Sequence, residues 1–134
     1  MSYVTDTHAI IWYMIDHPNL SSTARKAFEE VDSGQDQIFV PCIIFYELLY
    51  LIEKKKLDIN FDSLIAMVSS SANYRVEPLC LPIIEGSRTI TREEIPDPWD
   101  RLIIATSLHL GVPLITRDRA MQRIAQKVGV KVIW

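Results

Sequence analysis

The sequence predicts an α/β fold, a single-domain three-layer α/β/α sandwich over residues 1–134 with a mainly parallel central sheet. Short apolar strand segments alternate with helical segments along the chain, and this alternation implies parallel strands joined by right-handed crossovers. Hydrophobic residues make up 49% of the 134 residues, which is enough to bury a core without a metal or disulfides. Linkers, repeats and low-complexity segments are absent, so we expect any active site to be built within this one domain.

The N-terminal half contains two strand patterns and four helix patterns. The strands are predicted at 2–5 and 37–40, and the helices at 9–15, 22–31, 41–56 and 61–70. Pro18 ends the first helix, and Ser21 or Ser22 caps the second, which Gly34 closes. Pro41 suits the first turn of the long helix. The basic run at 54–56 either complements the dipole of that helix or contacts RNA.

The C-terminal half gives clearer signals. Strands are predicted at 74–79, 112–116 and 130–133, and helices at 81–90, 97–110 and 118–127. With Asp97 as N-cap, Pro98 falls at the favoured first helical position. Gly111 terminates that helix, and Asp118 caps the last one.

Composition limits the functional classes. The chain has 14 Lys+Arg against 17 Asp+Glu, which argues against coating nucleic acid through bulk positive charge but not against a nuclease. Cys42 and Cys80 belong to no CxxC pair, so we expect two buried thiols rather than zinc or a disulfide. Residues 1–15 lack a secretory pattern, and Glu47 breaks the longest apolar stretch, so the expected location is the cytoplasm.

Acidic residues recur where predicted strands end and helices begin, the edge where open parallel sheets bind ligands. They are Asp6, Glu47, Asp97, Asp100 and Asp118. For Asp6 and Asp118, helix capping and catalysis explain the residue equally well, and capping by Asp97 accounts for both Asp97 and Asp100. Glu47 lies on or beside an apolar helical stripe, where a carboxylate needs a cleft or a cation.

Carboxylates that converge on one edge repel one another and raise their own pKa values. A divalent cation removes that conflict, and Mg²⁺ and Mn²⁺ prefer oxygen ligands. Two such ions about 4 Å apart can activate water and stabilise a leaving oxygen in phosphodiester cleavage.

The chain contains four motif segments, in this order: Val-Thr-Asp-Thr-His at 4–8, Phe-Tyr-Glu-Leu at 45–48, Asp-Pro-Trp-Asp-Arg-Leu-Ile-Ile-Ala-Thr at 97–106 and Leu-Ile-Thr-Arg-Asp at 114–118. In this order these segments resemble the PIN domain and more specifically the VapC-type toxins of bacterial and archaeal toxin–antitoxin pairs. The ending Val-Lys-Val-Ile-Trp also fits. The resemblance covers essentially the whole chain.

The resemblance implies a metal-dependent endoribonuclease, the toxin of a type II toxin–antitoxin system, that hydrolyses RNA with water activated by one or two Mg²⁺ or Mn²⁺ ions. The matched catalytic and metal-binding acids are Asp6, Glu47, Asp100 and Asp118. Asp97 and Thr116 are auxiliary: Asp97 precedes a matched acid, and Thr116 either orients water or is an ordinary strand-end residue. A homodimer and a cognate antitoxin are also implied. Setting the four matched acids aside leaves 13 acids against 14 bases, a formal charge of plus one.

Substrate contacts fall to basic residues near these acids. The candidates are Arg101, Arg117, Arg119 and Arg123, although solvated or ion-paired arginines explain the pattern equally well. His8 is a weak candidate base because the metal route needs no histidine, and no aromatic residue is assigned to RNA. Two alternatives stay open: a catalytically silent PIN-like binding module, and another α/β phosphohydrolase such as an aspartate-nucleophile phosphatase, which usually has a second acid where His8 stands.

Overall fold

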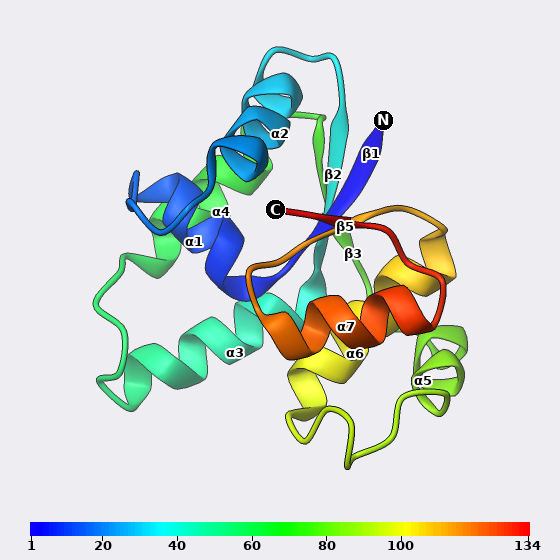
Figure 1. Cartoon of the computed structure of the whole chain (residues 1–134). Coiled ribbons are helices and arrows are strands. Elements are labelled where there is room, and N and C mark those ends of the chain that lie inside the picture. The colour runs from blue at the N-terminus through cyan, green and yellow to red at the C-terminus, as the bar shows by residue number, and fades with distance from the viewer.

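The computed structural model describes all residues from 1 to 134 and places five strands in one parallel sheet (Figure 1). The strands are β1 (Ser2–Thr5), β2 (Gln37–Pro41), β3 (Tyr74–Glu77), β4 (Leu114–Ile115) and β5 (Val132–Ile133). Their order is β3-β2-β1-β4-β5, and every neighbouring pair is parallel. The predicted fold class is therefore confirmed, with β1 at the centre.

Seven helices complete the layers. They are α1 (Thr7–Met14), α2 (Ser22–Asp32), α3 (Cys42–Glu53), α4 (Phe61–Ser69), α5 (Leu81–Ser87), α6 (Pro98–Leu110) and α7 (Arg119–Lys127). Helices α1, α2 and α4 lie on one side of the sheet, α5, α6 and α7 lie on the other, and α3 extends beyond the lower edge (Figure 1). None of these helices is both long and apolar enough to cross a membrane.

The core lies on both faces of the sheet. Val4, Ile38 and Leu114, from three adjacent strands, are completely buried. Strands covered on both faces read as nearly continuous apolar runs rather than as alternating patterns. This packing fixes β1, β2 and β4, so the residues that follow them leave the sheet at defined positions.

Most predicted elements are confirmed, and the differences lie at their ends. Helix α1 begins at Thr7 rather than at residue 9, because the preceding Asp6 caps it. Helix α3 ends at Glu53 rather than at residue 56, since Lys55 adopts a left-handed φ of 56°. The basic run therefore lies largely in the turn after α3. Strands β4 and β5 are two residues long each, shorter than expected.

The expectation of two buried thiols is wrong. Cys42 is exposed and Cys80 is partly exposed. Cys42 is the first residue of α3, and Cys80 is the N-cap of α5. Both cysteines lie where the chain enters a helix at the protein surface. Their side chains are therefore exposed or partly exposed, although their neighbours in the sequence are apolar.

Candidate active site at the carboxyl edge of the sheet

The carboxyl ends of β1, β2 and β4 meet at one edge of the sheet, the lower edge in Figure 1. Asp6 follows β1 directly, α3 follows β2 without a loop, and Thr116 follows β4. The N-terminus of α6 reaches the same edge (Figure 1). The five acidic residues predicted from the sequence all enter this region, and each is held differently.

Asp6 is almost buried, with 5% of its surface exposed, and its two oxygens are used separately. Oδ1 accepts a hydrogen bond from the Ala9 N–H at 2.8 Å, which makes Asp6 the N-cap of α1. Oδ2 accepts the Thr116 hydroxyl hydrogen at 2.5 Å. Burial raises the pKa of Asp6, and these two hydrogen bonds oppose the rise. Capping and membership of the site are therefore compatible here.

Glu47 lies in α3 with 8% of its surface exposed, between the completely buried Ile44 and Leu48. Its Oε2 accepts the hydroxyl hydrogen of Thr7 at 2.5 Å. Burial raises the pKa of Glu47, the Thr7 hydrogen bond lowers it, and the charge of Asp97 raises it again. The prediction that this carboxylate lies on an apolar stripe is confirmed.

The Asp97 and Asp100 pair opens α6. Asp97 is the N-cap: its Oδ1 accepts hydrogen bonds from the N–H groups of Trp99 at 2.8 Å and Asp100 at 3.3 Å. Burial, followed by the charges of Asp97, Glu47, Asp118 and Asp6, raises the pKa of Asp100 to about 7. The acids thus lie close enough to repel one another, as the sequence predicted.

Asp118 and Thr116 form one connected turn after β4. Asp118 caps α7 through the Met121 N–H at 2.9 Å, and the Asp118 N–H donates to the Thr116 Oγ1 at 3.2 Å. Gln122 Nε2 donates to the Thr116 carbonyl at 2.9 Å. Because the Thr116 hydroxyl donates to Asp6, its direct effect is to orient that carboxylate.

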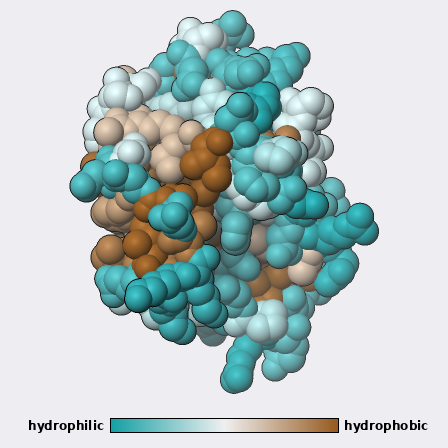
Figure 2. Space-filling model, turned by 90° about the vertical axis from the view of Figure 1, so that its left-hand side faces the viewer, coloured by the Kyte–Doolittle hydropathy of each residue, from teal (hydrophilic) through white to brown (hydrophobic).

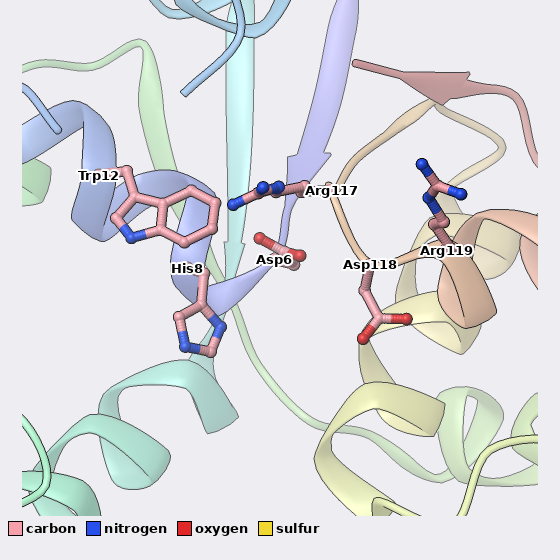
Figure 3. Close-up of a pocket in the computed structure, with 6 residues that line it drawn as sticks. All are labelled: Asp6, His8, Trp12, Arg117, Asp118 and Arg119. Carbon is pink, nitrogen blue, oxygen red and sulfur yellow. The ribbon is translucent and has the colours of Figure 1, made fainter. Parts of the chain in front are cut away.

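A pocket of about 350 Å³ opens between α1 and α7. Its lining residues are Asp6, His8, Trp12, Arg117, Asp118 and Arg119 (Figure 3). Asp6 lies between His8 and Asp118 in this view, and the Arg117 side chain reaches toward Trp12 (Figure 3). The pocket therefore offers carboxylate oxygens beside cationic and aromatic groups.

The donor set at this edge suits a hard divalent cation. The converging acids offer only oxygen ligands, and Mg²⁺ sites typically use one or two carboxylates and complete their coordination with water and substrate phosphate. No three Asp, Glu, His or Cys side chains form a tight cluster in this arrangement. The charges of Asp97, Glu47, Asp118 and Asp6 nevertheless all raise the pKa of Asp100. The residues fit a cation with an incomplete protein shell.

The four predicted arginines occupy different places. Arg117 and Arg119 line the pocket, whereas Arg123 lies exposed on α7 outside the lining. The Arg101 guanidinium donates to the carbonyls of Ile90 at 3.0 Å and Ser87 at 3.4 Å. Arg101 thus ties the end of α5 and the segment after it to α6, and we leave it out of the candidate RNA contacts.

Sequence reasoning missed two residues of the site. Thr7 holds Glu47, and Trp12 lines the pocket. The signal for Trp12 was its helical spacing: His8 and Trp12 are four residues apart in α1 and therefore share a face. Thr7 adjoins Asp6 in the motif that carried the resemblance, so its position was visible although its partner was not.

A parallel α/β/α sandwich with carboxylates gathered at the carboxyl edge defines a class of protein, and comparison with known proteins names it. The PIN domain family model matches residues 3–127, so the chain belongs to the PIN domain family. It is 27% identical over 118 residues to Ribonuclease VapC22 of Mycobacterium tuberculosis, covering 87% of each chain.

Solved structures give the same fold at lower identity. VapBC2 from Rickettsia felis, bound to a DNA fragment from its promoter, matches with a TM-score of 0.69 at 16% identity over 98% of this chain and 97% of that one. VapBC-1 from nontypeable Haemophilus influenzae matches with a TM-score of 0.63 at 22% identity over 98% and 96%.

Proposed function

We propose that this chain is a metal-dependent endoribonuclease and the toxin of a type II toxin–antitoxin pair. Its membership of the PIN family, its similarity to a ribonuclease named VapC22, and its fold shared with VapBC structures support this function. The observation that carries the chemistry is the set of crowded acids at the carboxyl edge of the sheet.

The crowded acids form no ion pairs, although the charge of His8 lowers the pKa values of Asp6 and Glu47. Five ion pairs occur in the structure, and none of them involves Asp6, Glu47, Asp100 or Asp118. Hydrogen bonds from Thr7 and Thr116 orient two of these carboxylates without neutralising them. Buried carboxylates without a compensating charge are costly, and a bound cation would supply that charge.

Asp6, Glu47, Asp100 and Asp118 would hold one or two Mg²⁺ or Mn²⁺ ions. When bound, such ions supply a more acidic water and stabilise the leaving oxygen. Asp97 caps α6 and adds negative charge beside Asp100. Thr116 keeps Asp6 oriented, so we assign it a positioning role.

The reaction is the hydrolysis of an RNA phosphodiester. A water oxygen forms a bond to phosphorus, the bond from phosphorus to one ribose oxygen breaks, and the departing oxygen takes up a proton. No covalent enzyme intermediate is needed. Arg117 and Arg119 border the pocket, and Arg123 extends the basic surface along α7. These residues are the candidate contacts to RNA phosphates.

Protein partners would use the exposed apolar surface of the chain. Figure 2 shows a hydrophobic patch on the face that carries α1, α3 and α4. Exposed apolar side chains on or next to these helices include Ile15, Leu49 and Ile65, with exposed fractions of 48%, 38% and 40%. Such patches are typical of interaction sites. We propose a cognate antitoxin and a second copy of the chain as partners, and the cytoplasm as the place of action.

The test replaces Asp6 or Asp118 with Asn and measures cleavage of RNA with Mg²⁺ or Mn²⁺, together with growth inhibition on expression. Loss of a ligand should lower cleavage by about a thousandfold, or ~4 kcal/mol. Asp32→Asn is the matched control because Asp32 lies at the opposite edge, where it accepts a hydrogen bond from Tyr74.

Unchanged cleavage in both Asn variants would contradict the mechanism. Antitoxin-free wild-type protein that neither binds metal nor cleaves RNA would favour the catalytically silent module instead. A phosphorylated Asp6 trapped during turnover would favour the aspartate-nucleophile alternative.

A further inference from the structure

Arg117 lies between Thr116 and Asp118 in the sequence, and its side chain points toward Trp12 (Figure 3). We propose that Arg117 grips the scissile phosphate of the RNA, and that Trp12 is a positioning residue that holds the Arg117 guanidinium in place. This inference rests on the proposed ribonuclease function. It separates Arg117 from the other arginines and gives a role to an aromatic residue of the pocket.

The backbone around Arg117 is fixed on both sides. The Asp6 N–H donates to the Ile115 carbonyl at 3.1 Å, and the Thr116 hydroxyl donates to Asp6. Gln122 Nε2 donates to the Thr116 carbonyl, and Asp118 caps α7. The Arg117 Cα is therefore held beside the carboxylates of Asp6 and Asp118, and only the rotamer of the Arg117 side chain can vary.

The Arg117 guanidinium lies over the face of an aromatic ring and does not pair with a carboxylate. Its guanidinium carbon lies 5.6 Å from the centre of the Trp12 ring, within cation–π range. Arg117 forms no ion pair, although Asp6 and Asp118 line the same pocket. A ring face binds the guanidinium without using its in-plane N–H donors. Those donors stay available for an anion.

Trp12 is itself held by other rings. It stacks on His17 with centroids 5.6 Å apart and planes 22° apart. It also lies at a tilt against His8 at 5.5 Å and Trp134 at 6.1 Å. These contacts come from α1, the segment after it and the chain end, so they restrict rotation of the indole. Trp12 is thus a stable platform for the guanidinium.

The other arginines are placed differently. Arg119 extends away from Trp12 on the far side of Asp118 (Figure 3). The Arg101 guanidinium donates hydrogen bonds to backbone carbonyls. Arg117 alone combines a place beside the acids with an aromatic support.

The chemistry of the guanidinium matches a phosphodiester. Its planar fork can donate two hydrogen bonds to phosphate oxygens, which a lysine ammonium cannot reproduce with the same geometry. Cleavage adds negative charge to those oxygens, so a prearranged cation should stabilise the transition state more than the bound substrate. The expected substrate class is RNA, with its scissile phosphate between Asp6 and Arg117.

The experiment measures steady-state cleavage of a fluorescent RNA by five variants: Arg117→Ala, Arg117→Lys, Trp12→Phe, Trp12→Leu and the Arg117→Ala, Trp12→Leu double variant. We expect kcat/KM to fall about a hundredfold in Arg117→Ala, mostly through kcat, with partial recovery in Arg117→Lys. Trp12→Leu should cost about tenfold and Trp12→Phe less, because Phe keeps a weaker ring face. Lys131→Ala, immediately before β5, is the control for loss of one positive charge.

The double variant separates positioning from a structural role. If Trp12 acts through Arg117, adding Trp12→Leu to Arg117→Ala should cost nothing further. A second readout is RNA binding without metal, where Arg117→Ala should reduce the slope of log Kd against log salt by about one phosphate contact.

The outcomes distinguish this inference from the proposed function. Wild-type protein that fails to cleave any RNA would refute the function itself. Normal cleavage and an unchanged salt slope in Arg117→Ala, with an active wild type, would overturn the role of Arg117. An equal loss from Trp12→Leu with and without Arg117 would overturn the role of Trp12.

Discussion

Carboxylates lie at both the amino edge and the carboxyl edge of the sheet, and the two groups differ in their partners and in the pKa shifts of their members. At the amino edge, Asp32 accepts hydrogen bonds from the hydroxyls of Tyr13 and Tyr74, and Asp36 pairs with the N-terminal amine. That amine lowers the pKa of Asp36. At the carboxyl edge, burial and neighbouring acids raise the pKa of Asp100 to about 7.

The difference lies in what each acid has for a partner. The amino-edge acids have phenol donors or a positive charge from the chain itself, as expected of groups that stabilise the fold. The carboxyl-edge acids receive hydrogen bonds but no ion pair. Removing a partner at the amino edge should therefore affect stability, and removing one at the carboxyl edge should affect activity.

The largest contrast is expected from two matched hydroxyl deletions. Thr116→Val removes the donor to Asp6, and it should lower RNA cleavage by about 10- to 100-fold, as loss of support to a metal ligand does. Tyr74→Phe removes a donor to Asp32, and it should lower the free energy of unfolding by about 1 kcal/mol while leaving cleavage unchanged. Cleavage rates and urea unfolding measure the two effects.

Thr116→Ser is the control because it keeps the hydroxyl that donates to Asp6. Its cleavage should stay near the wild-type rate. Equal losses of cleavage in Thr116→Val and Tyr74→Phe would remove the distinction between the two edges.

A smaller contrast is expected in the pH dependence of stability without metal. The pKa of Asp100 is about 7 in the folded protein and about 3.9 in an unfolded chain. The native state therefore binds more protons between these values, and stability should fall as pH rises from about 4 to 7. Asp36 contributes with the opposite sign, since its pKa is lowered on folding.

Thermal midpoints at pH 5 and pH 8 in a chelator measure this slope. Asp100→Asn should flatten it, and Glu47 and Asp6, whose pKa values are also raised, should keep part of it. A slope in Asp100→Asn as steep as in the wild type would show that Asp100 is not crowded in solution.

The acidic edge was predictable from the sequence for a topological reason. Parallel strands bring their carboxyl ends together, so residues that follow different strands become neighbours without any knowledge of side-chain packing. Asp6, Glu47 and Asp118 were found in this way. The cap at Asp97 was also predictable, because Pro98 fixes the first helical residue.

Contacts that depend on tertiary packing were not predictable. The rings around Trp12 include Trp134, which is 122 positions away along the chain, and no local pattern links them. The carbonyls that hold Arg101 belong to Ser87, the last residue of α5, and to Ile90 in the irregular segment after it. The early end of α3 depends on the left-handed conformation of Lys55, which residue propensity does not indicate.

The central claim is that the carboxyl-edge acids hold a divalent cation, and thermal unfolding in a Mn²⁺ titration tests it most directly. An ion that binds only the native state raises the thermal midpoint of the protein once the ion concentration exceeds its Kd. We expect a clear rise for wild-type protein and for Asp32→Asn, and loss of most of that rise for Asp118→Asn. An equal rise in Asp118→Asn and wild type would show that the cation binds elsewhere and not at the carboxyl-edge acids.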